Sequence, residues 1–519
     1  MKLRRVFRVA AAIIASLAVI SANALAQEKR KPKFTISKET TVVTGPVDED
    51  GYIDYAAALN QMRGKGVTAA TNANVLLWQA FGPKPEGSPM PDRFYQLMGT
   101  TAPVENNAQQ FRTIYKLFHL TQEERQKLDE QYDKARTYPW KSADFPRIVD
   151  WLGANEKSLA VTIEATKRPH YFSPLVTSKG GSVSGLIGVL VPGVQKCREL
   201  AGALTIRAMW HLGEGRIDQA WQDLLACHRL GRLVTRGSTL IEALVGIAID
   251  AIASNAALTF VEHAPLRAPQ LQACLRDLQG LPPMVAIADL IDQGERFIFH
   301  DSVMMMDRHG SKYLKGLVDG DPNQPDPIAD LMKQPIHWDP AMKKANVFYD
   351  AMVSAMRKLT RAERESALTK IDDELKQAKA KIDPKKFAEE IAKSKEPDMV
   401  LGGIIGDVLI SLLVPAVRKV QEASDRSTQT AGNLQLAFAL AAYRADNRRF
   451  PTNLMDVAPK YLAKVPQDVF SGKAVIYKKQ GDGYLLYSVG PNGKDDGGNW
   501  YNDEPKGDDP NVRMPRPKK

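Results

Sequence analysis

The residues best suited to chemistry form an oxygen-rich segment close to the C-terminus. Its asparagine and acidic side chains are Asn492, Asp495, Asp496, Asn499, Asn502, Asp503 and Glu504. Glycines at positions 490, 493, 497 and 498 make the backbone adaptable, and Ca²⁺ takes six to eight oxygen ligands in adaptable geometry. The segment therefore predicts a calcium site, for which a solvated acidic turn is the alternative. The candidate metal ligands are Asn492, Asp495, Asp496 and Asp503.

A second group of acids interrupts apolar helical segments in the middle of the chain. Its members are Glu242, Asp250, Asp289, Asp292 and Glu295. Paired carboxylates can act as general acid and general base, as they do in glycoside hydrolysis. Buried ion pairs with Arg207, Arg229, Arg232 or Arg296 would explain the same acids without any substrate. We favour the structural interpretation, and an extracytoplasmic hydrolase is the alternative.

Histidine, cysteine and the common catalytic motifs add no candidate catalytic residue. The eight histidines include no His-x-x-x-His or His-Glu-x-x-His spacing, and His228 lies on an apolar helical stripe. Three cysteines cannot complete a four-cysteine zinc site, and we expect all three to be buried thiols. The sequence contains no phosphate loop, dinucleotide fingerprint or serine elbow.

The first 26 residues have the three parts of an export signal. Lys2, Arg4, Arg5 and Arg8 precede an apolar run from Val9 to Ile20, and Ala24-Leu25-Ala26 follows it. Twelve apolar residues span only about 18 Å as a helix, which is too short for a hydrocarbon core of about 30 Å. We therefore expect cleavage near Ala26 and Gln27, and a periplasmic or extracellular protein.

The net charge gives little support to a nucleic-acid partner. The chain carries 70 basic and 60 acidic residues, for a formal charge of +10. Removal of the signal, with its four basic residues, lowers this to +6 (10 − 4), and much of the remainder lies in the two tails. A hydrophobic content of 44% is typical of a globular protein. We expect protein partners and no nucleic acid.

The segments between the signal and residue 398 are predicted to be mainly helical. We divide them into a linker at 27–50, an N-terminal helical region at 51–180 and a helical body at 181–398. Gly213-Glu214-Gly215 predicts a helical hairpin, whose segment Ala208–Leu230 resembles a single tetratricopeptide unit. The next helix, Leu240–Val261, is apolar on almost every side and is therefore predicted to be buried.

The C-terminal region changes pattern from helix to strand. An apolar run at Met399–Val417 continues as a long helix to about Asn447, and two strands follow at Ala474–Lys478 and Tyr484–Val489. Gly481-Asp482-Gly483 predicts the hairpin turn between them. The chain is therefore predicted to be α+β, with a helical body, a helix-and-hairpin module at 399–500 and a polar tail at 501–519.

The module resembles the type IV pilin-like proteins, above all the major pseudopilin of type II secretion. The resemblance rests on Ala442-Tyr443-Arg444-Ala445-Asp446-Asn447-Arg448-Arg449-Phe450-Pro451, on Val465-Pro466-Gln467-Asp468 and on Tyr487-Ser488-Val489-Gly490-Pro491-Asn492-Gly493. It implies a long helix packed on a small sheet and a Ca²⁺ site in the C-terminal loop. Because the helix is internal and no pilin processing site precedes it, we do not expect polymerisation into a pilus. The whole chain also resembles uncharacterised exported bacterial proteins, a resemblance that implies no activity.

The apolar run at 399–417 raises the question of a membrane contact. Nineteen residues are long enough to span a bilayer. Asp407 near the centre would cost about 2.5–3.5 kcal/mol on insertion scales, so we expect a helix buried against the body. The sequence thus predicts an exported, non-enzymatic envelope or secretion-associated scaffold. A membrane-anchored, pilus-like component remains a further alternative.

Overall fold

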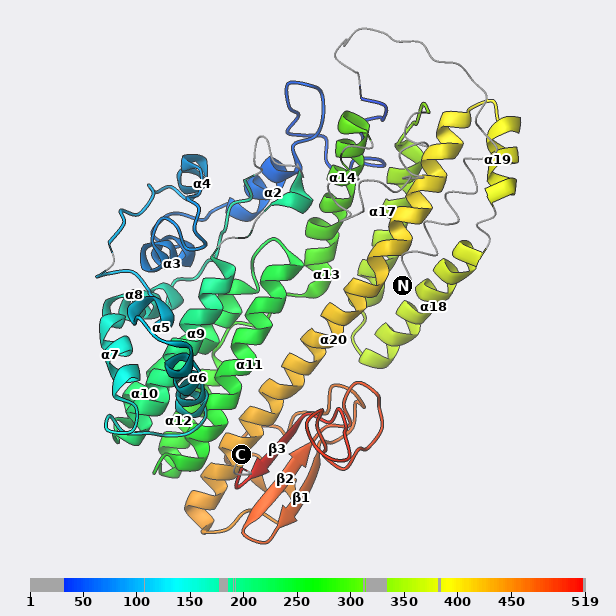
Figure 1. Ribbon diagram of the computed structural model, residues 1–519. Helices are drawn as coiled ribbons and strands as arrows, with labels where there is room; N and C mark the ends of the chain where they lie inside the picture. The colour runs from blue at the N-terminus through cyan, green and yellow to red at the C-terminus, as the bar shows by residue number, and fades with distance from the viewer. Residues whose placement is uncertain are drawn as a thin grey trace.

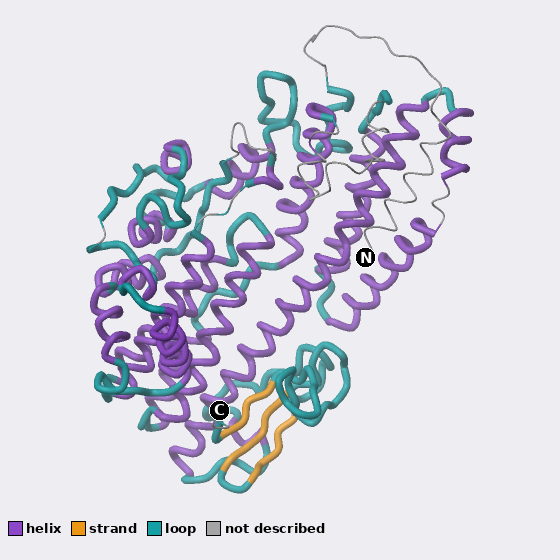
Figure 2. The backbone as a smooth tube through the Cα atoms, viewed as in Figure 1, coloured by secondary structure: helices purple, strands orange, loops and turns teal. Residues whose placement is uncertain are grey.

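The computed structural model describes residues 32–106, 108–176, 185–189, 191, 193–310, 313, 334–380 and 384–516. The side chains of residues 378–380, 384–388 and 411–416 are not described. The predicted export signal lies outside the described residues. The described chain is mostly helical and contains one small antiparallel sheet, which confirms the α+β class (Figure 2).

Short helices dominate the region before residue 170. They are α2 (Tyr55–Gly64), α3 (Ala73–Phe81), α4 (Asp92–Leu97), α5 (Ile114–Leu117), α6 (Gln122–Thr137), α7 (Pro146–Ala154) and α8 (Glu156–Thr166). α6 begins with a capping box, in which the side chains of Thr121 and Glu124 each accept a hydrogen bond from the backbone N–H of the other residue.

Longer helices form the centre of the molecule. They are α9 (Val194–Gly213), α10 (Ile217–Val234), α11 (Leu240–His263) and α12 (Ala268–Gln279), with the short 3₁₀ turn η1 (Leu186–Gly188) before them. The predicted hairpin is formed by α9 and α10. α10 and α11 approach closely at two glycines, because a Cβ on Gly246 would lie 2.6 Å from the carbonyl oxygen of Gly231. By length and composition alone α11 could cross a membrane, but more than half of its apolar window is buried in the core.

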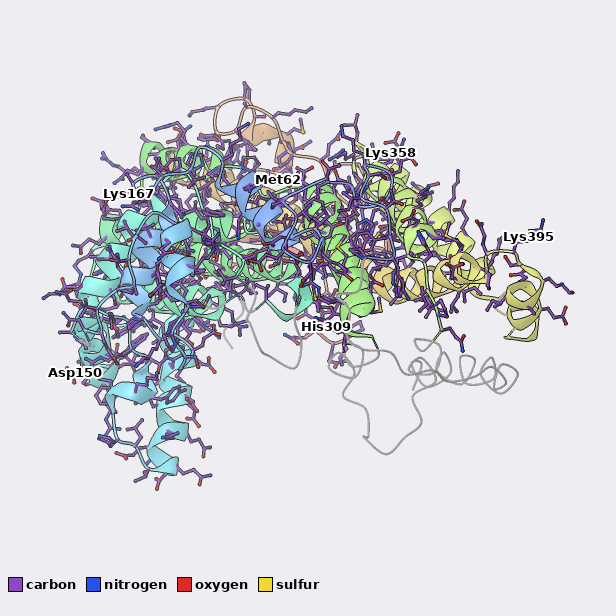
Figure 3. The ribbon with its side chains drawn as sticks, turned by 90° about the horizontal axis from the view of Figure 1, so that it is seen from above. Met62, Asp150, Lys167, His309, Lys358 and Lys395 are labelled. Carbon is purple, nitrogen blue, oxygen red and sulfur yellow. The ribbon has the colours of Figure 1, made fainter. Side chains whose placement is uncertain are left out.

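A second group of helices follows α12. It comprises α13 (Ile287–Leu290), the π-helical turn η2 (Ile291–Glu295), α14 (Arg296–His309), α17 (Asp339–Met356), α18 (Arg361–Ala380) and α19 (Pro384–Lys393). Together with the segment before α2, these helices surround a second hydrophobic core. Figure 3 shows the elongated shape that results, with Asp150 of α7 and Lys395, just after α19, near opposite ends.

The helix α20 (Pro397–Asn447) connects the two cores. Its 51 residues extend for about 75 Å at 1.5 Å per residue, and Figure 1 shows it running diagonally through the molecule. Its first turns pack closely, because a Cβ on Gly402 would lie 2.0 Å from the His337 carbonyl oxygen, and one on Gly406 would lie 2.7 Å from Ala341 Cα. The described part of the 399–417 run is therefore packed against the body.

The segment before α2 differs from the predicted linker. Phe34 is buried in the second core, and Thr40 and Thr41 are buried beside it. The Thr35 N–H donates a hydrogen bond to Asp339 Oδ1 at 2.7 Å, which ties this segment to the start of α17. Its described residues, from 32 onwards, are thus part of the helical body.

The small sheet packs near the C-terminal end of α20. Its strands β1 (Ile476–Gln480), β2 (Gly483–Tyr487) and β3 (Asn511–Met514) lie in the order β1-β2-β3, and both pairings are antiparallel. The predicted hairpin is confirmed by the pairing of Gln480 with Gly483. The short 3₁₀ turn η3 (Leu454–Val457) lies between α20 and the sheet.

The module extends beyond the predicted boundary at residue 500. β3 lies within the segment predicted to be a polar tail. Val512 and Met514 point into the core, while their neighbours in the strand are partly exposed. This alternation is typical of a strand with one buried face. The polar residues of the segment obscured that pattern in the sequence.

Candidate metal centre

The acidic segment forms the connection between β2 and β3, residues 488–510. Its two ends are held together by a hydrogen bond from the Ser488 N–H to the Pro510 carbonyl oxygen at 3.1 Å. Asn511 Nδ2 and Arg513 Nη2, both on β3, donate to the Gly498 carbonyl oxygen at 2.8 and 2.9 Å. The sheet therefore fixes both the ends and the middle of this connection.

One glycine allows the connection to fold back on itself. Gly490 has a φ of +63°, and a Cβ at this position would lie 2.3 Å from the carbonyl oxygen of Asp508. A side chain would therefore be excluded by both conformation and space. This close approach brings the start of the connection against Asp508, near its end.

Three carboxylates meet in this folded connection. Asp496, Asp508 and Asp509 each offer an oxygen atom, and these three oxygens lie within 4.8 Å of one another. Asp496 and Asp508 are partly exposed, whereas Asp509 is 0% exposed. The three side chains therefore form a cluster of like charges that extends from the surface into the interior.

The hydrogen bonds of the buried member leave one of its oxygens free. Asp509 Oδ2 accepts from the N–H groups of Asp496 and Gly498 at 3.0 and 2.9 Å. Its Oδ1 atom is buried and has no hydrogen-bond partner among the described residues, and the same is true of Asp508 Oδ1. A buried carboxylate oxygen without a partner is costly. A cation bound between these oxygens would remove that cost.

Charge repulsion and burial act together on the two adjacent acids. Burial, together with the charges of Asp496 and Asp495, raises the pKa of Asp509 to about 6. Burial also raises the pKa of Asp508, and the charges of Asp496 and Glu422 add to that effect. Both acids therefore hold their protons to a higher pH than an ordinary aspartate does, and a nearby positive charge would oppose this shift.

The dimensions of the cluster suit Ca²⁺. Calcium–oxygen distances of about 2.3–2.6 Å allow two ligands of one ion to lie up to about 5 Å apart, so three oxygens within 4.8 Å of one another can contact the same ion. Three carboxylates supply only part of a shell of six to eight oxygens. Backbone carbonyl groups and water would supply the others.

Of the four ligands predicted from the sequence, only Asp496 belongs to the cluster. Asn492 lies beside it, because its Nδ2 donates to Asp496 Oδ2 at 2.9 Å and its N–H donates to Asp508 Oδ2 at 3.0 Å. Asp495 Oδ1 accepts from the Gly497 N–H at 2.9 Å and stabilises a turn. Asn492 is thus a neighbour that orients two of the acids.

Asp503 lies elsewhere and has its own partners. Its Oδ2 atom accepts from the Trp500 N–H at 2.8 Å and from Arg513 Nη2 at 3.4 Å. The sequence interpretation proposed Asp495 and Asp503 as ligands, whereas the cluster contains Asp508 and Asp509. The only sequence signal for them is the acidic pair directly before Pro510, which was assigned to the polar tail.

The acids of the helical body are arranged differently. Asp250 is buried between α10 and α11, where its Oδ1 lies 2.9 Å from His228 Nδ1 and 3.3 Å from Arg232 Nε. These contacts hold the pKa of Asp250 below its usual value in spite of burial. His228, which lies on an apolar stripe in the sequence, is a buried histidine of the core.

The acids near η2 are also matched to arginines. Asp289 Oδ1 accepts from Arg357 Nη2 at 3.0 Å, and Asp292 Oδ1 lies 2.7 Å from Arg296 Nη2. Arg296 also contacts Asp350 Oδ1 at 2.7 Å. These pairs join α13, η2 and α14 to α17, so they explain Asp289 and Asp292 without a substrate. Glu295 has no ion pair among the described residues, and burial raises its pKa to about 7.

Glu242 is the most deeply buried acid of the body. Its Oε2 atom accepts from the N–H and Oγ1 of Thr239 at 3.1 and 3.0 Å, which completes a capping box at the start of α11. Its Oε1 atom has no partner among the described residues. Burial raises the pKa of Glu242 to about 7.

The three cysteines are buried free thiols, as predicted. Burial raises the pKa of Cys197, Cys227 and Cys274. Such thiols are poor nucleophiles.

Comparisons with known proteins assign no family to the chain. No protein-family model, curated protein or solved structure matches it. Function is therefore argued from the geometry of the site.

Proposed function

We propose that the protein is an exported, non-enzymatic scaffold whose C-terminal module binds Ca²⁺. The observation that carries the proposal is the buried Asp509 Oδ1, which has no hydrogen-bond partner in the described part of the chain and lies in a cluster with Asp496 and Asp508. Extracellular calcium modules bind with dissociation constants of about 10⁻⁴–10⁻³ M. The first 26 residues predict an exported protein, and we expect a site with three carboxylates to have a dissociation constant in this extracellular range.

The resemblance to pseudopilins supports the same proposal. A long helix followed by a small antiparallel sheet is the order that the resemblance implies, and the carboxylates lie in the connection between β2 and β3. Here the helix follows a large helical body. We infer that the module serves as a fixed, calcium-dependent end of a scaffold and that the body contacts protein partners.

Two further observations favour a scaffold over the alternatives. Asp250, Asp289 and Asp292 of the helical body pair with arginines, which favours a structural role for these three acids. Glu242 and Glu295 have no ion pair among the described residues, and burial raises the pKa of each to about 7. The first turns of α20 are packed against α17 and the segment before it, which disfavours their use as a membrane anchor.

Terbium luminescence tests the calcium site directly. Tb³⁺ replaces Ca²⁺ at oxygen sites and is excited by nearby tryptophan, and Trp500 lies in the same connection as the carboxylates. We expect the full chain to give a Tb³⁺ signal that Ca²⁺ displaces, and Asp509→Asn to lose it. Trp500→Phe is the control, since it should reduce the signal while Ca²⁺ still binds. A signal unchanged in Asp509→Asn would overturn the proposed site.

Export is tested separately by the mature N-terminus. The full chain expressed in a bacterium should be recovered from the periplasm or medium with Gln27 as its first residue, as measured by mass spectrometry. Recovery of an intact Met1 in the cytoplasm would contradict export.

A further inference from the structure

The connection that holds the carboxylates is contacted by arginines from two long helices. Arg361, at the start of α18, donates from Nη2 to the Pro491 carbonyl oxygen at 3.2 Å. Its guanidinium carbon also lies 4.8 Å from the centre of the Phe470 ring, within the range of a cation–π contact. Arg426 of α20 donates from Nη1 to the Tyr501 hydroxyl at 3.4 Å.

The residue that Arg361 contacts is next in the chain to a residue that hydrogen-bonds to the acidic cluster. Pro491 directly precedes Asn492, whose N–H and side-chain amide donate to Asp508 and Asp496. A movement of Pro491 would therefore move the hydrogen-bond donors of two of the three clustered acids. Figure 1 shows this connection beside the end of α18 that carries Arg361.

Arg361 is itself held in place from the other side. Its Nε atom lies 3.6 Å from Asp425 Oδ2, and Arg364 Nη2 contacts Asp425 Oδ1 at 2.8 Å. Asp425 is a buried residue of α20. The Pro491 contact thus joins the connection to a fixed point on the pair of helices α18 and α20.

We propose that Ca²⁺ binding at Asp496, Asp508 and Asp509 is coupled to the docking of α18 on the connection through Arg361. This inference rests on the proposed calcium site. Without a cation the three carboxylates repel one another, and the connection that carries Pro491 is loosened. With a cation they are drawn together, Asn492 is fixed, and Pro491 is presented to Arg361. Calcium then fixes the orientation of the α18–α20 pair relative to the module.

Coupling between two sites is reciprocal, so the loss of one contact weakens the other. Arg361→Gln should therefore weaken Ca²⁺ binding by about fivefold or more, at the lower end of typical coupling. Arg357→Gln is the matched control, because Arg357 also pairs with acids but contacts Asp289 and Asp292, away from the connection. We expect the control to bind Ca²⁺ within about twofold of the unchanged protein.

Isothermal titration of the full chain with CaCl₂ measures these affinities. Hydrogen exchange provides a second measurement that needs no substitution in α18: Ca²⁺ should slow amide exchange at residues 361–370 of the unchanged protein and not of Asp509→Asn. No Ca²⁺ binding to the unchanged protein would overturn the calcium site and this inference together. An unchanged Ca²⁺ affinity in Arg361→Gln would overturn the coupling alone. So would a rate of amide exchange in α18 that does not change when Ca²⁺ is added.

Discussion

The arginine-paired acids of the helical body and the clustered acids of the β2–β3 connection have opposite environments. In the body, Asp223 is buried against Arg207, whose Nε and Nη2 donate to its two oxygens at 2.9 and 2.6 Å. In the connection, Asp508 and Asp509 lie beside each other and beside Asp496, and each has a buried Oδ1 that no described residue contacts by a hydrogen bond. In the first arrangement each charge has a partner of opposite sign, whereas in the second a positive charge would offset the repulsion between the carboxylates. The difference separates acids that hold the fold together from acids that are available for a ligand.

The difference also determines whether a substitution lowers or raises the free energy of unfolding. Removal of one member of a buried ion pair leaves an uncompensated charge in the interior, which strongly destabilises the protein. Removal of one member of a like-charge cluster relieves repulsion. An acid of the body and an acid of the connection should therefore respond in opposite directions when no cation is present.

The largest expected effect is at Asp223. Asp223→Ala leaves the Arg207 side chain, which is only 12% exposed, without its partner, so we expect the free energy of unfolding to fall by about 3–5 kcal/mol. Urea unfolding followed by circular dichroism measures the change. Asp133→Ala is the control, because its pair with Arg136 is exposed and should contribute at most about 1 kcal/mol. Equal effects of the two substitutions would contradict the comparison.

The next largest effect concerns pH and Glu242. Its pKa is raised from 4.5 to about 7 in the folded protein, so between these values the folded state binds more protons than the unfolded state. The stability contribution of the neutral acid is full below about pH 4.5 and is lost as the pH rises through 7. At about 1.4 kcal/mol per unit, this amounts to up to about 3 kcal/mol.

The isosteric substitution Glu242→Gln isolates this contribution. We expect the substituted protein to lose less stability between pH 5 and pH 8 than the unchanged one, as measured by urea unfolding at both values. Asp301 has its pKa raised to about 7 in the same direction, mainly by burial, so some pH dependence should remain. An identical pH dependence in both proteins would show that Glu242 is charged throughout.

The smallest effect is expected at Asp503. It is paired with Arg513 and lies outside the cluster, although the sequence alone predicts it as a ligand. Asp503→Asn should change the Ca²⁺ affinity by less than about threefold in a terbium displacement titration. A loss as large as that of Asp509→Asn would favour the sequence interpretation over the structural one.

Local patterns predict most of the fold. The capping box at Thr121 and Glu124, the glycine turn between α9 and α10, and the hairpin turn between β1 and β2 each depend on residues close together in the sequence. Local patterns do not predict β3, because the strand is short and its outward-facing side chains are polar. Its place is fixed by pairing with β2, from which it is separated by a long connection.

Prediction of the candidate site from the sequence has the same limit. Oxygen-rich composition identifies the segment in which three carboxylates meet, and one of the four predicted ligands, Asp496, is a member of that cluster. The choice of Asp508 and Asp509 depends on how the connection closes, through Ser488 and Pro510, and on the space left at Gly490. Those contacts join residues that are distant along the chain, so spacing within the acidic segment could not reveal them.

The most direct test of the account is a calorimetric titration of the full chain with Ca²⁺, at pH 7.5 and 0.15 M salt. We predict one site per chain with a dissociation constant of 1 mM or tighter, in line with extracellular calcium modules, and a loss of at least about 100-fold in affinity in Asp509→Asn. Asp482→Asn, in the exposed turn between β1 and β2, is the control and should bind normally. Absence of binding at millimolar Ca²⁺, or equal binding by Asp509→Asn, would contradict the account.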